Sequence, residues 1–213
     1  MARTARSGKR IVGGRTLVGH MVVGITGASG VIYGVRALEM LRQLGIQTHL
    51  VMTRSARLTL GYETERKMKD VAALASVIYK PEDIAAPIAS GSFRTLGMLV
   101  APCSIRTLSE IATGVTSSLL TRAADVVLKE RRRLVLLVRE TPVHLGHLRS
   151  MAAVTEMGAI VMPPVPAFYT RPRTIDDIVD HTVGRALDLF GLDTGTVRRW
   201  GEEVGPRCTV GGD

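Results

Sequence analysis

Aromatic residues and cysteines are scarce in this 213-residue sequence. Aromatic residues make up 4% of the chain, with one tryptophan, so there are few rings on which nucleic-acid bases could stack. The two cysteines, Cys103 and Cys208, have no CxxC partner and no histidine-rich neighbour. This pattern argues against a disulfide framework and against a zinc site, and it fits the reducing cytoplasm.

Long hydrophobic runs are also missing. Apolar stretches such as Leu134–Val138 and Ala159–Val165 are shorter than the roughly 20 residues of a membrane-spanning helix, and charged residues separate them. The sequence therefore predicts no transmembrane segment. Because 46% of the residues are hydrophobic, the chain can still bury a sizeable core, and its length fits one compact domain.

Acidic residues are absent from the first twenty positions, which carry five of the basic residues behind the net charge of +9: Arg3, Arg6, Lys9, Arg10 and Arg15. This segment lacks the apolar centre of a secretory signal, although its composition is similar to that of an organellar transit peptide. We expect residues 1–20 to be a disordered basic leader, or translation to start at Met21. Residues 21–200 then form the domain, and 201–213 a flexible Gly-rich tail.

Strand and helix patterns alternate from Met21 onward. The expected strands are Met21–Thr26, Thr48–Met52, Val77–Tyr79, Gly97–Ala101, Leu134–Val138 and Ala159–Met162. The expected helices are Val31–Leu44, Ser55–Tyr62, Ser104–Ala112, Leu119–Glu130, Leu145–Met157 and a last one capped by Thr174 and ending near Leu189. This alternation predicts an α/β fold of three layers, with a mostly parallel sheet between helices.

A glycine-rich turn follows the first strand, with Gly27 and Gly30 at its ends. Such a turn offers backbone N–H groups and a helix N-terminus to a phosphate, although it also occurs merely to pack helix against strand. The spacing is not GxGxxG, and Thr53-Arg54-Ser55 stands where a dinucleotide site places an acidic residue. The mononucleotide FMN therefore fits better than NAD, while Arg54 leaves NADP as a weaker alternative.

Several motifs together resemble the flavin prenyltransferase family of the UbiX type. They are Gly24–Gly30, Ala101–Ser104, Arg122–Arg132, Arg139–Pro142, His147-Leu148 and Pro163–Tyr169. They occur in order and span nearly everything from Met21 to Trp200. Ser90–Thr95 and His144–His147 resemble the subgroup associated with hydroxyaryl-acid decarboxylases, in which some members are described as one of the subunits of a decarboxylase.

The resemblance implies a flavodoxin-like Rossmann fold, a homo-oligomer that is commonly a dodecamer, and no metal. It implies that reduced FMN and dimethylallyl phosphate meet at a subunit interface. The dimethylallyl group would be joined to N5 and C6 of the flavin with release of phosphate. The product, prenylated FMN, would serve a UbiD-type aromatic acid decarboxylase.

The family's site residues carry over onto matching positions of this chain. For FMN they are Gly27, Ala28, Ser29, Thr53, Ser104, Ile105, Arg106, Thr107 and Arg139. For the prenyl phosphate they are Ser90, Gly91, Arg122, Lys129, Glu140, Tyr169 and Arg185, with Trp200 as a further substrate-binding candidate. The implied catalytic set is Ser29, Glu63, Lys129 and Glu140.

The chemistry of these residue types agrees with such a reaction. Loss of phosphate from an allylic carbon needs positive charge and hydrogen-bond donors, which Lys129 and the arginines supply. The alternative for the basic run is a solvated helix end, and we favour it for residues 131–133. Tyr169 and Trp200 could steady an allylic cation through their ring faces, whereas Trp200 could equally be an interface anchor.

Proton transfer during ring substitution needs an acid–base residue. Glu140 follows an apolar strand, where ligand sites of parallel sheets cluster, although an ion pair with a nearby arginine would also explain it. Glu63 follows a short helix and by sequence rules alone would be a surface carboxylate. Only the resemblance makes Glu63 a catalytic candidate, with Ser29 as a relay hydroxyl.

Other reactive side chains have simpler explanations. Cys103 lacks a nearby base and is expected to be a small buried residue beside the flavin. His144 and His147 lack carboxylate or thiolate companions, so we expect them to form hydrogen bonds at a helix start. Ser117 and Ser118 replace an amide dipeptide that is common in the family, which bears on the choice of prenyl donor.

Two other flavoprotein functions remain as alternatives. One is a flavin-dependent cysteine decarboxylase, which would not need the basic phosphate-binding residues. The other is an accessory subunit of a hydroxyaryl-acid decarboxylase without turnover of its own. Nucleic-acid binding through the basic leader is a more distant fourth possibility.

Overall fold

The computed structural model describes residues 10–12, 15–17 and 19–206. Parts of the predicted leader and tail therefore lie outside the described residues, and so does Cys208. Within the leader, β1 (Arg10–Val12) and β2 (Arg15–Leu17) pair antiparallel, a pair that the sequence did not predict. No helix of the described residues is long and apolar enough to cross a membrane.

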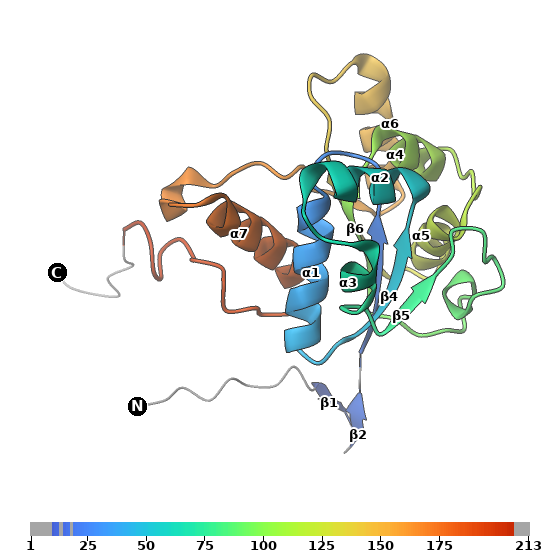
Figure 1. The fold of residues 1–213 in the computed structure, drawn as a ribbon, viewed down its shortest axis with the longest axis horizontal. Helices are drawn as coiled ribbons and strands as arrows, with labels where there is room; N and C mark the ends of the chain where they lie inside the picture. The colour runs from blue at the N-terminus through green and yellow to red at the C-terminus, as the bar shows by residue number, and fades with distance from the viewer. Residues whose placement is uncertain (1–9, 13–14, 18, 207–213) are drawn as a thin grey trace.

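A six-stranded sheet forms the centre of the domain (Figure 1). Its strands are β3 (His20–Ile25), β4 (Gln47–Met52), β5 (Val77–Tyr79), β6 (Gly97–Cys103), β7 (Arg133–Val138) and β8 (Ile160–Val161). Their order is β5-β4-β3-β6-β7-β8, and every neighbouring pair is parallel. Counted from β3, this is the order 3-2-1-4-5-6 of the Rossmann fold, so the predicted fold class is confirmed.

Helices cover both faces of the sheet, as the alternation of the sequence predicted (Figure 1). One face carries α1 (Val31–Gln43), α2 (Arg54–Glu63), the short α3 (Met68–Ala72) and α7 (Ile175–Asp188). The other carries α4 (Ile105–Ala112), α5 (Leu119–Lys129) and α6 (Leu145–Glu156). Two 3₁₀ turns, η1 (Pro87–Ala89) and η2 (Phe168–Thr170), lie in the connections.

Local sequence explains both the burial of the central strands and the start of α7. All seven residues of β6 are buried, as expected of a central parallel strand with helices on both sides. The Thr174 hydroxyl accepts a hydrogen bond from the Asp177 amide at 3.1 Å, and Asp177 Oδ2 accepts one from Thr174 N–H at 3.0 Å. This capping box starts α7 where the sequence predicted it.

Candidate active site

The strand order reverses between β3 and β6, because the connection after β3 leads to β4 on one side and the connection after β6 leads to β7 on the other. Ligands of open parallel sheets bind beside the carboxyl ends of the strands at such a point. The loops that follow β3, β4, β6 and β7 meet there. They carry most of the residues predicted to bind the cofactor.

Thr26 ties the two central loops together. Its buried hydroxyl donates to the Pro102 carbonyl at 2.8 Å and accepts from the Ser104 amide at 2.7 Å. Because Thr26 is fully buried and polar, losing these partners would leave unsatisfied groups in the core. Sequence reasoning missed this role, although a hydroxyl residue between an apolar strand and a glycine turn was a signal for it.

The glycine turn is tightly packed against the loop after β4. A Cβ atom at Gly27 would overlap the hydroxyl of Ser55, so only glycine fits there. Gly30 has φ of 96°, a left-handed conformation that also favours glycine, and α1 starts at the next residue. Ala28 and Ser29 are thereby held at the sheet edge.

Glu63 closes the start of α1. Its carboxylate accepts hydrogen bonds from Gly30 N–H at 2.9 Å and from Val31 N–H at 3.0 Å. An anion is favoured at this helix end by the helix dipole. Glu63 is exposed, as sequence rules predicted, but the fold also brings it to the turn that contains Ser29. A ligand phosphate at the α1 N-terminus would compete with this carboxylate.

The other two helix starts at this edge carry hydroxyl groups. Thr53 caps α2 by accepting from Ala56 N–H at 3.2 Å, and its hydroxyl lies 3.1 Å from that of Ser55. Ser104 caps α4 by accepting from Thr107 N–H at 3.3 Å, and it donates to the Thr107 hydroxyl at 3.2 Å. These hydroxyls and helix N-termini form a donor set suited to a phosphate-bearing mononucleotide.

The remaining predicted cofactor residues differ in exposure. Ile105 is half-buried in the first turn of α4, whereas Arg106 is exposed and forms an ion pair with Glu110 at 2.9 Å. Arg139 follows β7, and its amide donates to the Cys103 carbonyl at 3.0 Å. Burial raises the pKa of Tyr33 on α1, and the positive charge of Arg139 partly offsets this effect.

Glu140 and Cys103 occupy contrasting environments at this edge. Glu140 is exposed and its carboxylate accepts from Thr141 N–H at 3.1 Å; no ion pair of the described residues includes it. Cys103 is fully buried, and burial raises the pKa of its thiol to about 12. The prediction that Cys103 is a small buried residue is therefore confirmed.

Four predicted substrate residues converge at a second place. Ser90 and Gly91 follow η1, while Arg122 and Lys129 project from α5. Arg122 Nε donates to the Ala89 carbonyl at 3.3 Å, and a Cβ atom at Gly91 would lie 2.8 Å from Lys129 Nζ. The fold thus brings together the guanidinium group of Arg122, the amine of Lys129 and the loop that carries the Ser90 hydroxyl.

Ion pairs partly neutralise the positive charge of Arg122 and Lys129 in this second group. Lys129 Nζ donates to Glu130 at 2.6 Å, and Arg122 donates to Asp125 at 2.6 Å. Ser118 caps α5, since its hydroxyl accepts from Thr121 N–H at 3.4 Å, and Ser117 donates to Glu110 at 2.9 Å. The two serines that replace the family's amide dipeptide therefore have local structural roles.

The third group of predicted residues surrounds α7. The rings of Tyr169 and Trp200 meet edge to face with centroids 5.4 Å apart, and Trp200 remains 60% exposed. Arg185 forms an ion pair with Asp188 at 2.8 Å. His181, which sequence reasoning missed, places Nε2 3.5 Å from the Tyr169 hydroxyl. Because α7 and α5 cover opposite faces of the sheet, this third group and Lys129 lie apart within a single chain (Figure 1).

Two further predictions concerned basic and imidazole side chains. His144 Nδ1 accepts from Gly146 N–H at 3.0 Å, and His147 Nδ1 accepts from His144 N–H at 3.5 Å, which confirms their role at the start of α6. Residues 131–133 were assigned to a solvated helix end. Arg131 and Arg133 are exposed, but for Arg132 the prediction is wrong: its side chain is 18% exposed and hydrogen-bonded to the loop after η1.

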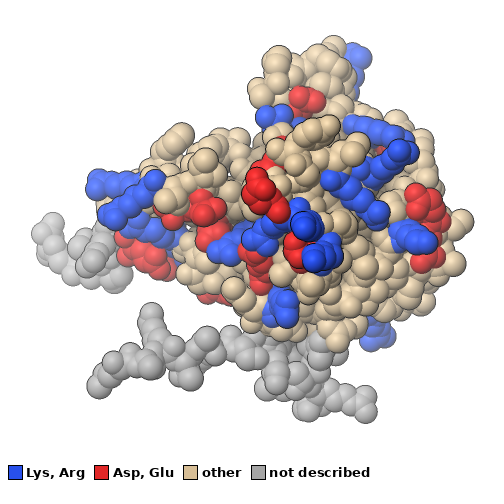
Figure 2. Space-filling model, viewed as in Figure 1, with Lys and Arg blue, Asp and Glu red and all other residues tan. Residues whose placement is uncertain are grey.

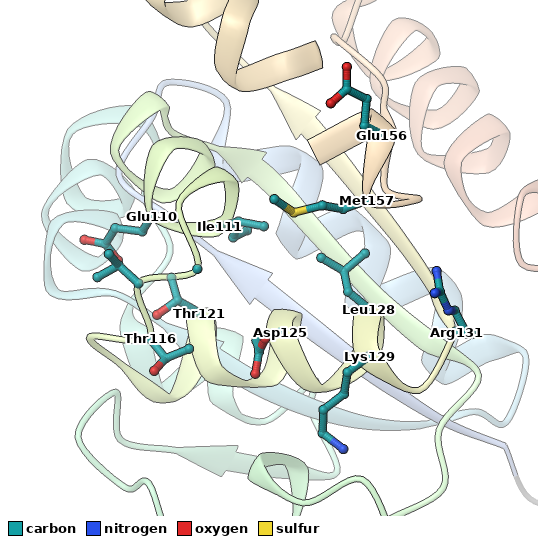
Figure 3. A pocket seen from close by; sticks show the side chains of 12 residues that line it. Glu110, Ile111, Thr116, Thr121, Asp125, Leu128, Lys129, Arg131, Glu156 and Met157 are labelled. Carbon is teal, nitrogen blue, oxygen red and sulfur yellow. The ribbon is translucent and has the colours of Figure 1, made fainter. Parts of the chain in front are cut away.

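A separate hollow of about 690 Å³ lies between α4, α5 and the end of α6 (Figure 3). Ile111, Leu128 and Met157 give it an apolar wall, and Lys129 stands at its border. Of the predicted site residues, only Lys129 borders it, so this hollow is distinct from the sheet edge. Among the described residues, no cluster of three or more histidine, cysteine or acidic side chains could hold a metal ion.

The fold and the sheet-edge site define a flavoprotein, and the flavoprotein family model matches residues 15–187. The flavin prenyltransferases UbiX of Escherichia coli and Thauera aromatica are 60% and 54% identical to this chain over 174 and 181 residues. These alignments cover 81% and 85% of this chain and 92% and 93% of the relatives. The chain belongs to the flavin prenyltransferase UbiX family and is an enzyme of that class.

Solved structures agree with this membership. AnUbiX (PadA1), determined with FMN and dimethylallyl pyrophosphate, has a TM-score of 0.85 and 51% identity, covering 85% of this chain and 97% of its own. A dodecameric FMN-dependent UbiX-like decarboxylase from Escherichia coli has a TM-score of 0.83 and 51% identity, covering 85% and 98%. The cysteine decarboxylase SpaF, with 16% identity and a TM-score of 0.56 over 67% and 82%, shares the fold alone.

Proposed function

We propose that this protein joins the dimethylallyl group of dimethylallyl phosphate to N5 and C6 of reduced FMN and releases phosphate. The observation that carries this proposal is the meeting of Ser90 and Gly91 with Arg122 and Lys129, residues from two distant segments of the chain. A cysteine decarboxylase has no need of such a phosphate-binding group. Membership in the prenyltransferase family supports the same conclusion.

The residues at the sheet edge fit FMN. Glu63 already supplies an anion to α1, so the phosphate of FMN is better served at α2, where Thr53 and Ser55 present hydroxyls and Arg54 follows. Ser104 and Thr107 offer further hydroxyls at α4, and Arg139 adds positive charge. Bound there, reduced FMN supplies the nitrogen and the ring carbon that receive the dimethylallyl group.

The chain's basic residues act on the leaving phosphate. Lys129 supplies a compact positive charge and Arg122 a planar fork of donors, while Ser90 offers a hydroxyl. The allylic C–O bond breaks with its electron pair going to the phosphate, so these donors stabilise the charge as it develops. Glu63, Glu140 and Ser29 are placed at the sheet edge to hold and move the protons that ring substitution releases.

We infer that the complete site forms between copies of this chain. Tyr169, Arg185 and Trp200 lie across the sheet from Lys129, so a second copy must bring them to the donor. A homo-oligomer satisfies this requirement, and the dodecameric relative from Escherichia coli gives the assembly that we propose here. The exposed ring of Trp200 suits a contact with a neighbouring copy.

We further propose that the product serves a UbiD-type aromatic acid decarboxylase in the cytoplasm. The sequence segments Ser90–Thr95 and His144–His147 support membership in the subgroup associated with hydroxyaryl-acid decarboxylases. The face shown in Figure 2 carries basic and acidic side chains, with a group of basic ones at its upper right. Because the chain has few aromatic residues on which bases could stack, we propose small phosphorylated ligands as partners in place of a polynucleotide.

The decisive experiment is anaerobic incubation of the purified protein with reduced FMN and dimethylallyl phosphate, followed by flavin mass and released phosphate. We expect the flavin mass to increase by one dimethylallyl group, with equimolar phosphate. Glu140→Gln should slow this reaction by about 100-fold or more, whereas Glu156→Gln, at an exposed carboxylate of α6, should not. FMN that stays unmodified with both the phosphate and the pyrophosphate donor would refute the proposal and favour an accessory or cysteine-decarboxylating flavoprotein.

A further inference from the structure

The loop after η1 is fastened by Arg132, which follows α5. One guanidinium nitrogen donates to the Phe93 carbonyl and the other to the Gly91 carbonyl, each at 2.6 Å. A planar fork of donors suits two carbonyl oxygens two residues apart, and lysine cannot reproduce this geometry. Both bonds end on backbone atoms of the segment that carries Ser90 and Gly91.

The turn between α5 and β7 directs Arg132 inward. Arg131 adopts a left-handed conformation with φ of 55°, and the Arg132 amide donates to the Val127 carbonyl at 2.9 Å. Arg131 and Arg133 consequently face solvent, while the Arg132 side chain is 18% exposed. Its charge is balanced by Glu130, whose Oε2 lies 3.8 Å away.

Aromatic packing holds the same loop from the side of the sheet. The Phe93 ring lies 5.1 Å from the ring centre of His20 and 5.0 Å from that of His49. His20 and His49 belong to β3 and β4, so Phe93 is seated on the sheet. The backbone between Ser90 and Phe93 is therefore fixed by Arg132 and by Phe93.

This loop has little room to move without disturbing the basic group. A Cβ atom at Gly91 would overlap the Glu130 carboxylate and lie 2.8 Å from Lys129 Nζ. A small shift of the Gly91 backbone would thus change the distance between the loop and Lys129. Both terminal nitrogens of Arg132 donate to the loop carbonyls, so its effect on the donor phosphate would pass through the position of the loop.

Resting on the proposed function, we propose that Arg132 is a positioning residue that sets the loop bearing Ser90 and Gly91 against Lys129 for binding of the donor phosphate. The role is distinct from that of Lys129 and Arg122, which contact the phosphate themselves. It predicts an effect on the prenyl donor that does not extend to FMN.

The test compares Arg132→Lys with Arg133→Lys, which keeps the same charge at an exposed neighbouring position. Steady-state kinetics would give kcat and the KM for dimethylallyl phosphate and for reduced FMN, and hydrogen exchange would follow peptide 89–96. We expect Arg132→Lys to raise the donor KM about tenfold and the loop exchange rate about tenfold, with the FMN KM within about twofold of the parent protein. Arg133→Lys should change none of these.

Two results would overturn the inference: an unchanged donor KM in Arg132→Lys, or an equal rise in the KM values of donor and FMN. If Arg132→Lys fails to fold, as judged by thermal unfolding, Phe93→Leu provides the same comparison through the other anchor. A parent protein without turnover would refute the proposed function instead. Loop exchange separates the two failures, because unchanged exchange in Arg132→Lys contradicts the Arg132 role whether or not the parent protein turns over.

Discussion

His49 is a buried imidazole with hydrogen bonds on both nitrogens. Nε2 lies 3.0 Å from His20 Nδ1, and Nδ1 lies 2.9 Å from the Tyr79 hydroxyl. Burial, helped by the neighbouring His20, lowers the pKa of His49 to about 4. An unfolded histidine titrates near pH 6.5. Between about pH 4 and pH 6.5, the unfolded chain therefore binds a proton on His49 that the folded chain does not bind.

Folding stability should therefore fall as the pH drops from about 6.5 to about 4, by up to about 3 kcal/mol from this residue. His49→Gln should lose less stability over this range than the parent protein. Urea unfolding at pH 7 and pH 4.5 would measure the difference, with His147→Gln, at a half-buried position in the first turn of α6, as control. His20 and Tyr79 face His49, and the pKa of Tyr79 is raised by burial and by the charge of Asp83. The same measurement on variants of these three residues would show how far they contribute to the pH dependence. An identical pH dependence in His49→Gln would contradict this account.

Glu63 links stability and chemistry at a single carboxylate. Glu63→Gln removes the charge at the α1 N-terminus and should lower the free energy of unfolding by about 0.5–1 kcal/mol. Because the proposed reaction needs a proton-accepting group beside Ser29, the rate of flavin prenylation should fall by about 100-fold or more. Denaturant unfolding and single-turnover assays would measure both, with exposed Glu65→Gln as control. A loss of stability at full activity would leave Glu63 a purely structural cap.

At the scale of elements, Thr26 joins the ends of β3 and β6. Thr26→Val keeps the side-chain shape but leaves the Ser104 amide without its acceptor and the Pro102 carbonyl without a side-chain donor. We expect a loss of about 1–3 kcal/mol in the free energy of unfolding and weaker FMN binding. Equilibrium unfolding and flavin titration would test this against Thr116→Val, at an exposed position. Unchanged FMN affinity would show that the hydrogen bonds of Thr26 to the loop after β6 do not shape the cofactor site.

At the scale of the whole molecule, the proposed site needs residues from different copies. Lys129→Ala and Arg185→Ala should each be inactive alone, since each removes one part of every site. Mixed after reversible dissociation, they should regain about one quarter of the parent activity if every site takes one part from each of two copies. Separately tagged variants with activity assays on the mixed assembly would measure this. No recovery in a demonstrably mixed oligomer would place both residues in one chain's site.

Much of the fold was predictable from the sequence. Each expected strand from Met21 onward is present, because apolar runs bounded by glycine, proline and cap residues are local signals. Helix α3 and the β1–β2 pair were not predicted, since short elements carry few residues and hence weak periodicity. The glycine turn was recognised from its place between a strand and a helix, whereas the other cofactor residues were found through resemblance.

The sequence by itself determined the α/β alternation, the caps and the family, because these depend on near neighbours and on motifs in order. The tertiary structure decided the contacts between distant segments: Glu63 on α1, Thr26 between two loops, and Arg132 beneath the loop after η1. It also decided that α7 and α5 lie on opposite faces of the sheet. Chain proximity carries no information on such contacts, since they arise only when parallel strands bring separate loops to one edge.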